Sequence, residues 1–111
     1  MANKYLHQAL IPSAASETTM YTVPAANTGV LRSLRVTNAN STGPSVITVT
    51  QYNSGSATAH YLLKAKSLAV NTTIDVFNGV PCVLEAGDVL KVTSSLATNH
   101  FYLSYLEMDR N

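Results

Sequence analysis

Short stretches in which β-branched and aromatic residues alternate with polar ones run through the whole sequence, and this two-residue period is typical of strands. In the stretch 45–52, for example, Ile47 and Val49 fall on one face of a strand and Thr48 and Thr50 on the other. Such stretches recur about every 8 to 12 residues between clusters of Gly, Pro, Asn and Ser, a spacing that indicates a sandwich or barrel. Only residues 61–69 have a composition that favours a helix, and this stretch is short and runs into β-branched residues.

The pattern predicts an all-β fold, an antiparallel β-sandwich of about eight strands with jelly-roll or immunoglobulin-like topology. The sequence does not choose between these two topologies. Its 111 residues fit one domain. We expect residues 17–111 to form the sandwich and residues 1–16 to form an N-terminal strand or arm that can reach a neighbouring subunit. An open sandwich is also expected to leave an exposed edge strand that can pair with a partner, but the sequence does not identify that edge.

Local signals add detail to this fold. Uninterrupted alternation along the stretch 29–37 places Arg32 and Arg35 on opposite faces of one strand. Asn78-Gly79 is the strongest tight-turn dipeptide in the chain. The segment Glu85–Asp88 is predicted to be a turn in which the Asp88 carboxylate accepts hydrogen bonds from backbone N–H groups.

The charge content argues for contact with proteins. Charged residues make up 12% of the chain, against about 25% in an average soluble protein, so surface polarity comes from Ser, Thr and Asn. A surface of this kind costs little to desolvate when another protein covers it. The net charge is +1 and the basic residues form no run, which excludes electrostatic capture of nucleic acid. We expect no membrane span, because no apolar run approaches about 18 residues, and no signal peptide, because the N-terminus lacks an apolar core.

Residues that could carry chemistry are scattered along the sequence. The single cysteine, Cys82, lies in an apolar stretch and is expected to be a buried small hydrophobe. His7, His60 and His100 lie in three distant segments without a metal-ligand spacing. No nucleophile elbow, phosphate-binding loop or dinucleotide fingerprint is present. The sequence therefore predicts no catalytic, cofactor-binding or metal-binding residue, and a protein that is not an enzyme.

Tyrosine is the most informative side chain for binding. Its ring packs while its hydroxyl stays near water or a polar partner, which suits the edge of a core and also suits protein interfaces, where tyrosine is enriched. Tyr102 and Tyr105 are expected on opposite faces of the last strand. The candidate interface residues are Tyr5, His7, Tyr21, Tyr52, Tyr102 and Tyr105.

Four segments, read in order, carry a resemblance to a known family. They are Leu31-Arg32-Ser33-Leu34-Arg35-Val36-Thr37-Asn38, Val46-Ile47-Thr48-Val49, Leu68-Ala69-Val70-Asn71-Thr72-Thr73 and Val83-Leu84-Glu85-Ala86-Gly87-Asp88-Val89-Leu90-Lys91-Val92. Together they resemble the small all-β structural proteins, of decoration or cement type, found in tailed-bacteriophage virions. The resemblance covers about residues 29–93. The last segment also resembles a strand–turn–strand step of cupins, but the histidine and glutamate pattern of a cupin metal site is missing.

The resemblance implies a role in the virion, after synthesis in the host cytoplasm, without catalytic residues or cofactors. It implies a protein that binds the outside of the major capsid shell and stabilises it, with the major capsid protein or other virion proteins as partners. It also implies self-association, often as a trimer. Two alternatives stay open. One is a neck, tail or fibre protein of the phage particle, and the other is a carbohydrate- or ligand-binding sandwich that uses exposed tyrosines and loop asparagines such as Asn53 or Asn99.

Overall fold

In a computed structural model that describes residues 3–40, 42–55 and 57–109, the described chain forms nine strands and no helix. The strands are β1 (Asn3–Leu10), β2 (Thr18–Thr22), β3 (Asn27–Asn38), β4 (Ser45–Asn53), β5 (Thr58–Leu68), β6 (Thr73–Asp75), β7 (Cys82–Leu84), β8 (Val89–Ser94) and β9 (Asn99–Asp109). The described residues contain no helix that is long and apolar enough to cross a membrane.

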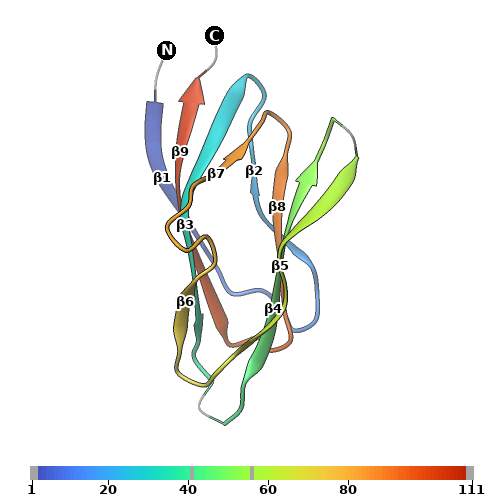
Figure 1. The fold of residues 1–111 in the computed structure, drawn as a ribbon, viewed down its shortest axis with the longest axis vertical. Helices are drawn as coiled ribbons and strands as arrows, with labels where there is room; N and C mark the ends of the chain where they lie inside the picture. The colour runs from blue at the N-terminus through green and yellow to red at the C-terminus, as the bar shows by residue number, and fades with distance from the viewer. Residues whose placement is uncertain (1–2, 41, 56, 110–111) are drawn as a thin grey trace.

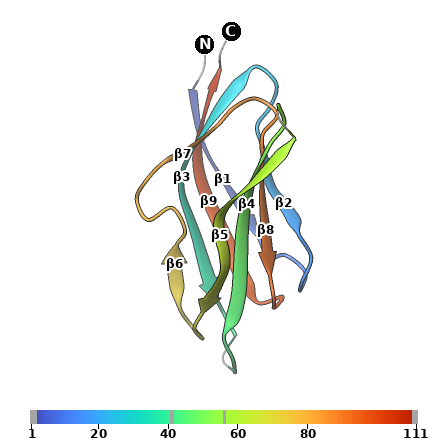
Figure 2. The same ribbon diagram turned by 45° about the vertical axis from the view of Figure 1, so that its right-hand side comes forward.

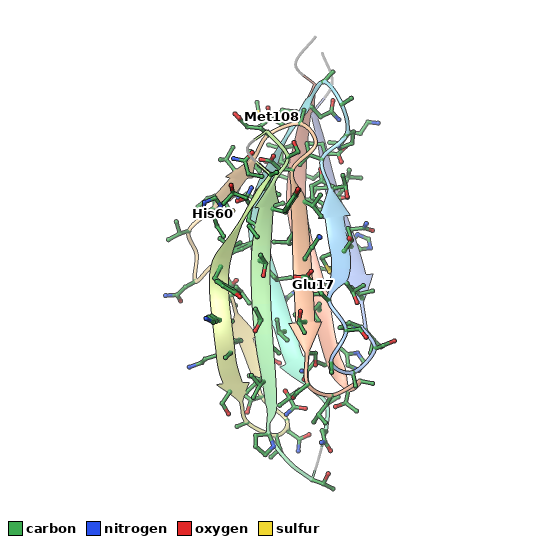
Figure 3. All side chains as sticks on the ribbon, turned by 90° about the vertical axis from the view of Figure 1, so that its right-hand side faces the viewer. Glu17, His60 and Met108 are labelled. Carbon is green, nitrogen blue, oxygen red and sulfur yellow. The ribbon has the colours of Figure 1, made fainter. Side chains whose placement is uncertain are left out.

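The strands form two antiparallel sheets that pack face to face (Figures 1 and 2). Sheet A has the order β1-β9-β3, and both β6 and β7 pair with the remaining edge of β3. Sheet B has the order β2-β8-β4-β5, and its four strands lie side by side facing the viewer in Figure 3. The all-β sandwich expected from the sequence is therefore confirmed.

The pairing order decides the topology in favour of a jelly roll. The chain pairs from its two ends inward, β1 with β9, β2 with β8, β3 with β7 and β6, and β4 with β5. It therefore resembles one long hairpin, rolled up so that β9 also pairs with β3 and β8 with β4. Both chain ends consequently lie at the same end of the sandwich (Figure 1).

The core lies between the two sheets and follows the predicted alternation. Ile47 and Val49 of β4 point inward against Phe101 and Leu103 of β9, and all four are at most 1% exposed. Burying an aliphatic or aromatic side chain of this size contributes about 1.5–3 kcal/mol. The remaining fully buried large side chains are Val23, Leu31, Leu34, Val36, Leu68, Leu84, Leu90 and Val92.

A bulge in β3 overturns one expectation from the sequence. The pairing of β3 with β9 shifts between Leu31 and Ser33, so Arg32 is an extra residue on β3. An extra residue reverses the alternation beyond it. Leu31 and Leu34 both point into the core, and Arg32 and Arg35 are both exposed on the outer face of sheet A. The prediction that these two arginines lie on opposite faces is wrong.

Buried polar side chains join the sheets at the end of the sandwich opposite the chain termini. Asn99 of β9 accepts a hydrogen bond from Ser45 of β4 over 2.9 Å and donates to Ser94 of β8. Asn38 of β3 donates to the carbonyl oxygen of Leu68 in β5 over 3.1 Å. These asparagines are fully buried, and because buried polar groups are costly unless bonded, they fix how the two sheets meet.

The predicted turns are present. The Val80 N–H donates to the Phe77 carbonyl oxygen over 2.9 Å around Asn78-Gly79, where both residues have positive φ values of 52° and 82°. The Asp88 N–H closes the Glu85–Asp88 turn on the Glu85 carbonyl oxygen, and the Asp88 carboxylate accepts the Glu85 N–H over 3.0 Å. The role predicted for Asp88 is confirmed.

Candidate protein-interaction surface

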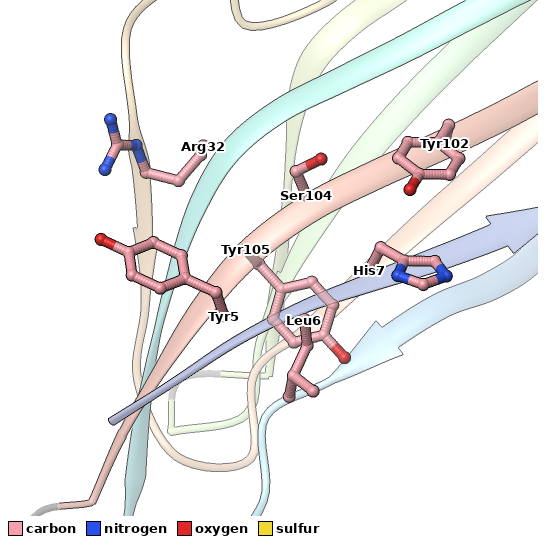
Figure 4. A pocket seen from close by; sticks show the side chains of 7 residues that line it. All are labelled: Tyr5, Leu6, His7, Arg32, Tyr102, Ser104 and Tyr105. Carbon is pink, nitrogen blue, oxygen red and sulfur yellow. The ribbon is translucent and has the colours of Figure 1, made fainter. Parts of the chain in front are cut away.

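The outer face of sheet A is hollowed over β1, β9 and β3. The hollow has a volume of about 530 Å³ and is lined by Tyr5, His7, Arg32, Tyr102 and Ser104, together with Leu6 and Tyr105, whose side chains point toward sheet B. Figure 4 shows Tyr5 and Arg32 at one end of it and the His7 and Tyr102 rings at the other. Three strands that are far apart in sequence therefore contribute side chains to one surface.

A stack of three side chains crosses this face. The rings of His7 and Tyr102 have centroids 5.4 Å apart and planes 8° from parallel. The Arg35 guanidinium carbon lies 5.6 Å from the Tyr102 ring centroid, on the strand where Arg35 pairs directly with Tyr102. Stacking of this kind restrains long side chains in an extended surface arrangement, so the face is organised before any partner arrives.

The same face is basic. Arg32 and Arg35 are both exposed, and among the residues that the structure describes neither guanidinium has a carboxylate within ion-pair distance. Asp75 is the direct neighbour of Arg35 on β6, but its carboxylate accepts the backbone N–H groups of Leu34 and Phe77. The guanidinium donors therefore have no carboxylate partner among the residues that the structure describes.

An apolar row crosses sheet A next to the arginines. Tyr5 of β1 pairs with Leu106 of β9, Leu106 with Val30 of β3, and Val30 with Val83 of β7. Tyr5 is 74% exposed and Val83 62% exposed. Aromatic and aliphatic residues beside arginine are the composition of the centre of a protein–protein interface.

The outer face of sheet B differs in chemistry. The outward positions of its central strands include Thr48, which pairs with Thr93. Lys91 of β8 lies 3.9 Å from the Glu17 carboxylate and 5.2 Å from the centroid of the Tyr52 ring. Lys91 is therefore paired within the chain, whereas Lys64 and Lys66 at the β5 edge are exposed, as are Val46 and Tyr61.

The six candidate interface residues fall into three groups. Tyr5, His7 and Tyr102 come together on the outer face of sheet A, where all three are exposed. Tyr52 lies half-buried on sheet B under Lys91. Tyr21 and Tyr105 are buried and pack on each other, with ring centroids 4.3 Å apart. A role for any of them in binding remains a prediction.

Tyr21, Tyr105 and Glu107 interact with one another near the chain ends. The Tyr21 hydroxyl donates a hydrogen bond to Glu107 Oε2 over 2.7 Å. Burial, followed by this hydrogen bond, raises the pKa of Tyr21 well above its ordinary value, and burial with the nearby Glu107 charge raises that of Tyr105. These contacts connect β2 of sheet B to β9 of sheet A.

Other candidates for chemistry stay separate. Cys82 is half-buried on β7, and burial raises the pKa of its thiol, so it is a poor nucleophile. In the described part of the chain, no three His, Cys, Asp or Glu side chains gather closely enough to hold a metal ion. Asn99 is fully buried between the sheets, and Asn53 accepts the Gly55 N–H within its own turn. Asn99 is therefore not available to a sugar.

The sequence did not indicate that Arg32, Arg35 and the apolar row belong to one surface. Their assembly depends on the bulge at Arg32 and on pairing between strands distant in sequence. Regular alternation places Leu31 and Leu34, which are three residues apart, on opposite faces, and this spacing was the signal for the bulge in this stretch of sequence.

The fold and this surface define a small jelly-roll module with one face suited to protein contact, and comparisons with known proteins agree on the fold. No protein-family model and no curated protein matches the sequence. A chain of the T13 particle of infectious bursal disease virus is similar, with a TM-score of 0.59 and 11% identity over 95% of this chain. This chain spans only 30% of that viral chain.

Two further structures are similar. A subunit of Bacillus endospore appendages, described as disulfide-linked pili, has a TM-score of 0.56 and 12% identity, and the match covers 99% of this chain and 88% of that one. A pentameric capsid protein from metagenomic phage sequences matches with a TM-score of 0.38 and 18% identity over 95% of this chain and 60% of that one. At 11% and 12% identity, the two matches with TM-scores of 0.59 and 0.56 support the fold alone.

Proposed function

We propose that the chain is a non-enzymatic structural protein of a virus particle, and specifically a decoration or cement protein. It binds the outside of the major capsid shell and stabilises it. The observation that carries the proposal is the outer face of sheet A, where Arg32 and Arg35 have no carboxylate partner in the described chain and lie beside the apolar row of Tyr5, Leu106, Val30 and Val83. The likeness to a chain of a virus particle supports it.

In this proposal sheet A faces the shell and sheet B faces solvent. The apolar row loses its water when the shell covers it, and Arg32 and Arg35 meet carboxylates of the capsid protein. A bidentate arginine–carboxylate pair gives the contact orientation as well as strength. The outer face of sheet B, where Thr48 pairs with Thr93 and Lys91 with Glu17, stays exposed to solvent in this arrangement. Residues 3–10 lie in β1 of their own chain, and the reach of an N-terminal arm to a neighbour remains a prediction.

Rebinding to stripped shells tests this arrangement. Particles freed of this protein are mixed with the purified chain, and bound chain is measured by sedimentation. We expect Arg35→Glu and Val83→Asp to weaken binding at least about tenfold, which corresponds to about 1.4 kcal/mol. The matched charge reversal Lys66→Glu, at an exposed site on the edge of sheet B, should bind like the unaltered chain. Binding of Arg35→Glu with unaltered affinity would contradict the proposed orientation.

A second candidate is a neck, tail or fibre subunit. The match to the endospore appendage subunit supports it, because it covers 88% of that chain, so the two modules are of similar size. Such a subunit repeats along an axis through head-to-tail contacts. Electron microscopy of the concentrated purified chain tests this candidate. Regular filaments or rings would favour it over decoration, and dispersed small particles would count against it.

A further inference from the structure

The sandwich leaves four free edges among its described strands, and they differ in how well they are protected. Sheet A ends at β1 on one side and at β6 and β7 on the other, whereas sheet B ends at β2 and at β5. An edge strand presents a row of unpaired N–H and C=O groups that can pair with another chain. Proteins normally blunt such edges with short strands, bulges or lysines.

Three of the four edges carry such protection. β2 has five residues and a bulge between Thr19 and Tyr21. β6 and β7 have three residues each and are separated by a loop. β5 is long, but its pairing shifts register twice, Ala65 has a positive φ of 52°, and Lys64 and Lys66 are exposed beside it.

The remaining edge, β1, is neither short nor bulged. Its eight residues, 3–10, pair with β9 in an unbroken register. Its one lysine, Lys4, lies near the start of the strand. Residues 4–9 are exposed on both faces of the sheet, and Leu6 is 37% exposed on the side that points toward sheet B. A long and regular edge of this kind is a site for strand addition.

We propose that β1 pairs antiparallel with β1 of a second copy across a two-fold axis, so that sheet A continues through both molecules. In a two-fold antiparallel pair, opposed residues lie on the same face and their numbers add to a constant even sum. The register centred on Leu6 opposes Leu6 to the partner's Leu6, Tyr5 to the partner's His7 and Lys4 to the partner's Gln8.

The side chains favour this register and a second copy as the occupant. It joins two exposed leucines on the inner face and extends the His7–Tyr102 stack by the partner's Tyr5 on the outer face. It opposes no like charges. A register centred on His7 would oppose two imidazoles and set Leu6 against the partner's Gln8. The pairing does not depend on the virion role and forms in the purified chain.

Cysteine cross-linking tests both the pairing and its register. In a Cys82→Ser background, Leu6→Cys places two thiols on directly opposed residues, whose Cα atoms are about 4.5–5.5 Å apart in an antiparallel pair and so within disulfide range. Lys4→Cys places them four residues apart along the strands, roughly 13 Å, which is out of range. Tyr61→Cys, exposed on the β5 edge, is the matched control.

Under mild oxidation we expect covalent dimers from Leu6→Cys and monomers from the other two variants. Equal cross-linking of all three, or cross-linking through Lys4→Cys instead, would overturn the proposal. Light scattering after gel filtration gives an independent readout without cysteines. The unaltered chain should be a dimer, Leu6→Lys a folded monomer by circular dichroism, and Leu62→Lys on β5 a dimer. An unaltered chain that is monomeric at every concentration would also overturn the proposal.

Discussion

Replacement of Asp88 by alanine is expected to be among the most damaging single changes in this chain. Asp88 is 6% exposed. Its oxygens accept the backbone N–H groups of Glu85 over 3.0 Å and Ser54 over 3.1 Å, and two longer bonds come from Gln51 Nε2 and Ser54 Oγ at 3.4 and 3.5 Å. The carboxylate thereby connects the turn before β8 to the hairpin between β4 and β5.

The magnitude follows from the two short bonds. A hydrogen bond to a charged group contributes about 1.5–3 kcal/mol, and a buried N–H left without an acceptor costs about 1–3 kcal/mol. Because water can enter beside the exposed Ser54 and recover part of the loss, we expect Asp88→Ala to lower the free energy of unfolding by about 3–5 kcal/mol. Asp88→Asn keeps one acceptor oxygen and should cost about 1–2 kcal/mol.

Urea unfolding followed by circular dichroism measures these differences. Glu85→Ala is the matched control, because this carboxylate lies exposed in the same turn, and it should change the free energy of unfolding by less than about 0.5 kcal/mol. If Asp88→Ala costs less than about 1 kcal/mol, the carboxylate does not hold the two loops together and the reasoning is refuted.

Three further changes have defined outcomes. Asn99→Ala removes both hydrogen bonds of a fully buried amide and should lower the free energy of unfolding by about 2–4 kcal/mol in urea. Gly87→Ala places a Cβ 2.8 Å from Ser54 Oγ at a φ of +85° and should cost about 1–3 kcal/mol in the same assay. The pKa of Tyr21 is ordinarily 10.0 and is raised in the folded chain. As the pH rises, the Tyr21 hydroxyl therefore loses its proton at a lower pH in the unfolded chain than in the folded chain. The contribution of Tyr21 to the free energy of unfolding is therefore fully present below pH 10.0 and should fall above it by about 1.4 kcal/mol per pH unit. The fall should be smaller in Tyr21→Phe, and an equal fall in both proteins would refute the prediction.

The sandwich could be predicted from the sequence because strand period and turn residues are local properties. Alternation placed Ile47 and Val49 on one face of a strand, which the structure shows to be the core face, and the turns at Asn78-Gly79 and Asp88 follow from the conformational preferences of those residues. The jelly-roll order could not be predicted, because it depends on which distant strands pair, as when β1 meets β9.

Part of the candidate surface was also predictable. Tyr5, His7 and Tyr102 were proposed from residue type, and the structure brings them together on one face. The arginines were assigned to opposite faces because a bulge has no reliable signature in a single sequence, and one extra residue at Arg32 reverses the alternation. The burial of Tyr21 has a similar cause, since the bulge in β2 turns both Met20 and Tyr21 inward.

The copy number of this chain in purified particles tests the central proposal most directly. Quantitative mass spectrometry would compare it with the major capsid protein of the same particle. A decoration protein is expected at about one copy per capsid subunit, or one oligomer at each local symmetry axis of the shell. A ratio of a few per cent would assign the chain to the neck or tail instead. Complete absence from the particle would contradict a structural role in the virion.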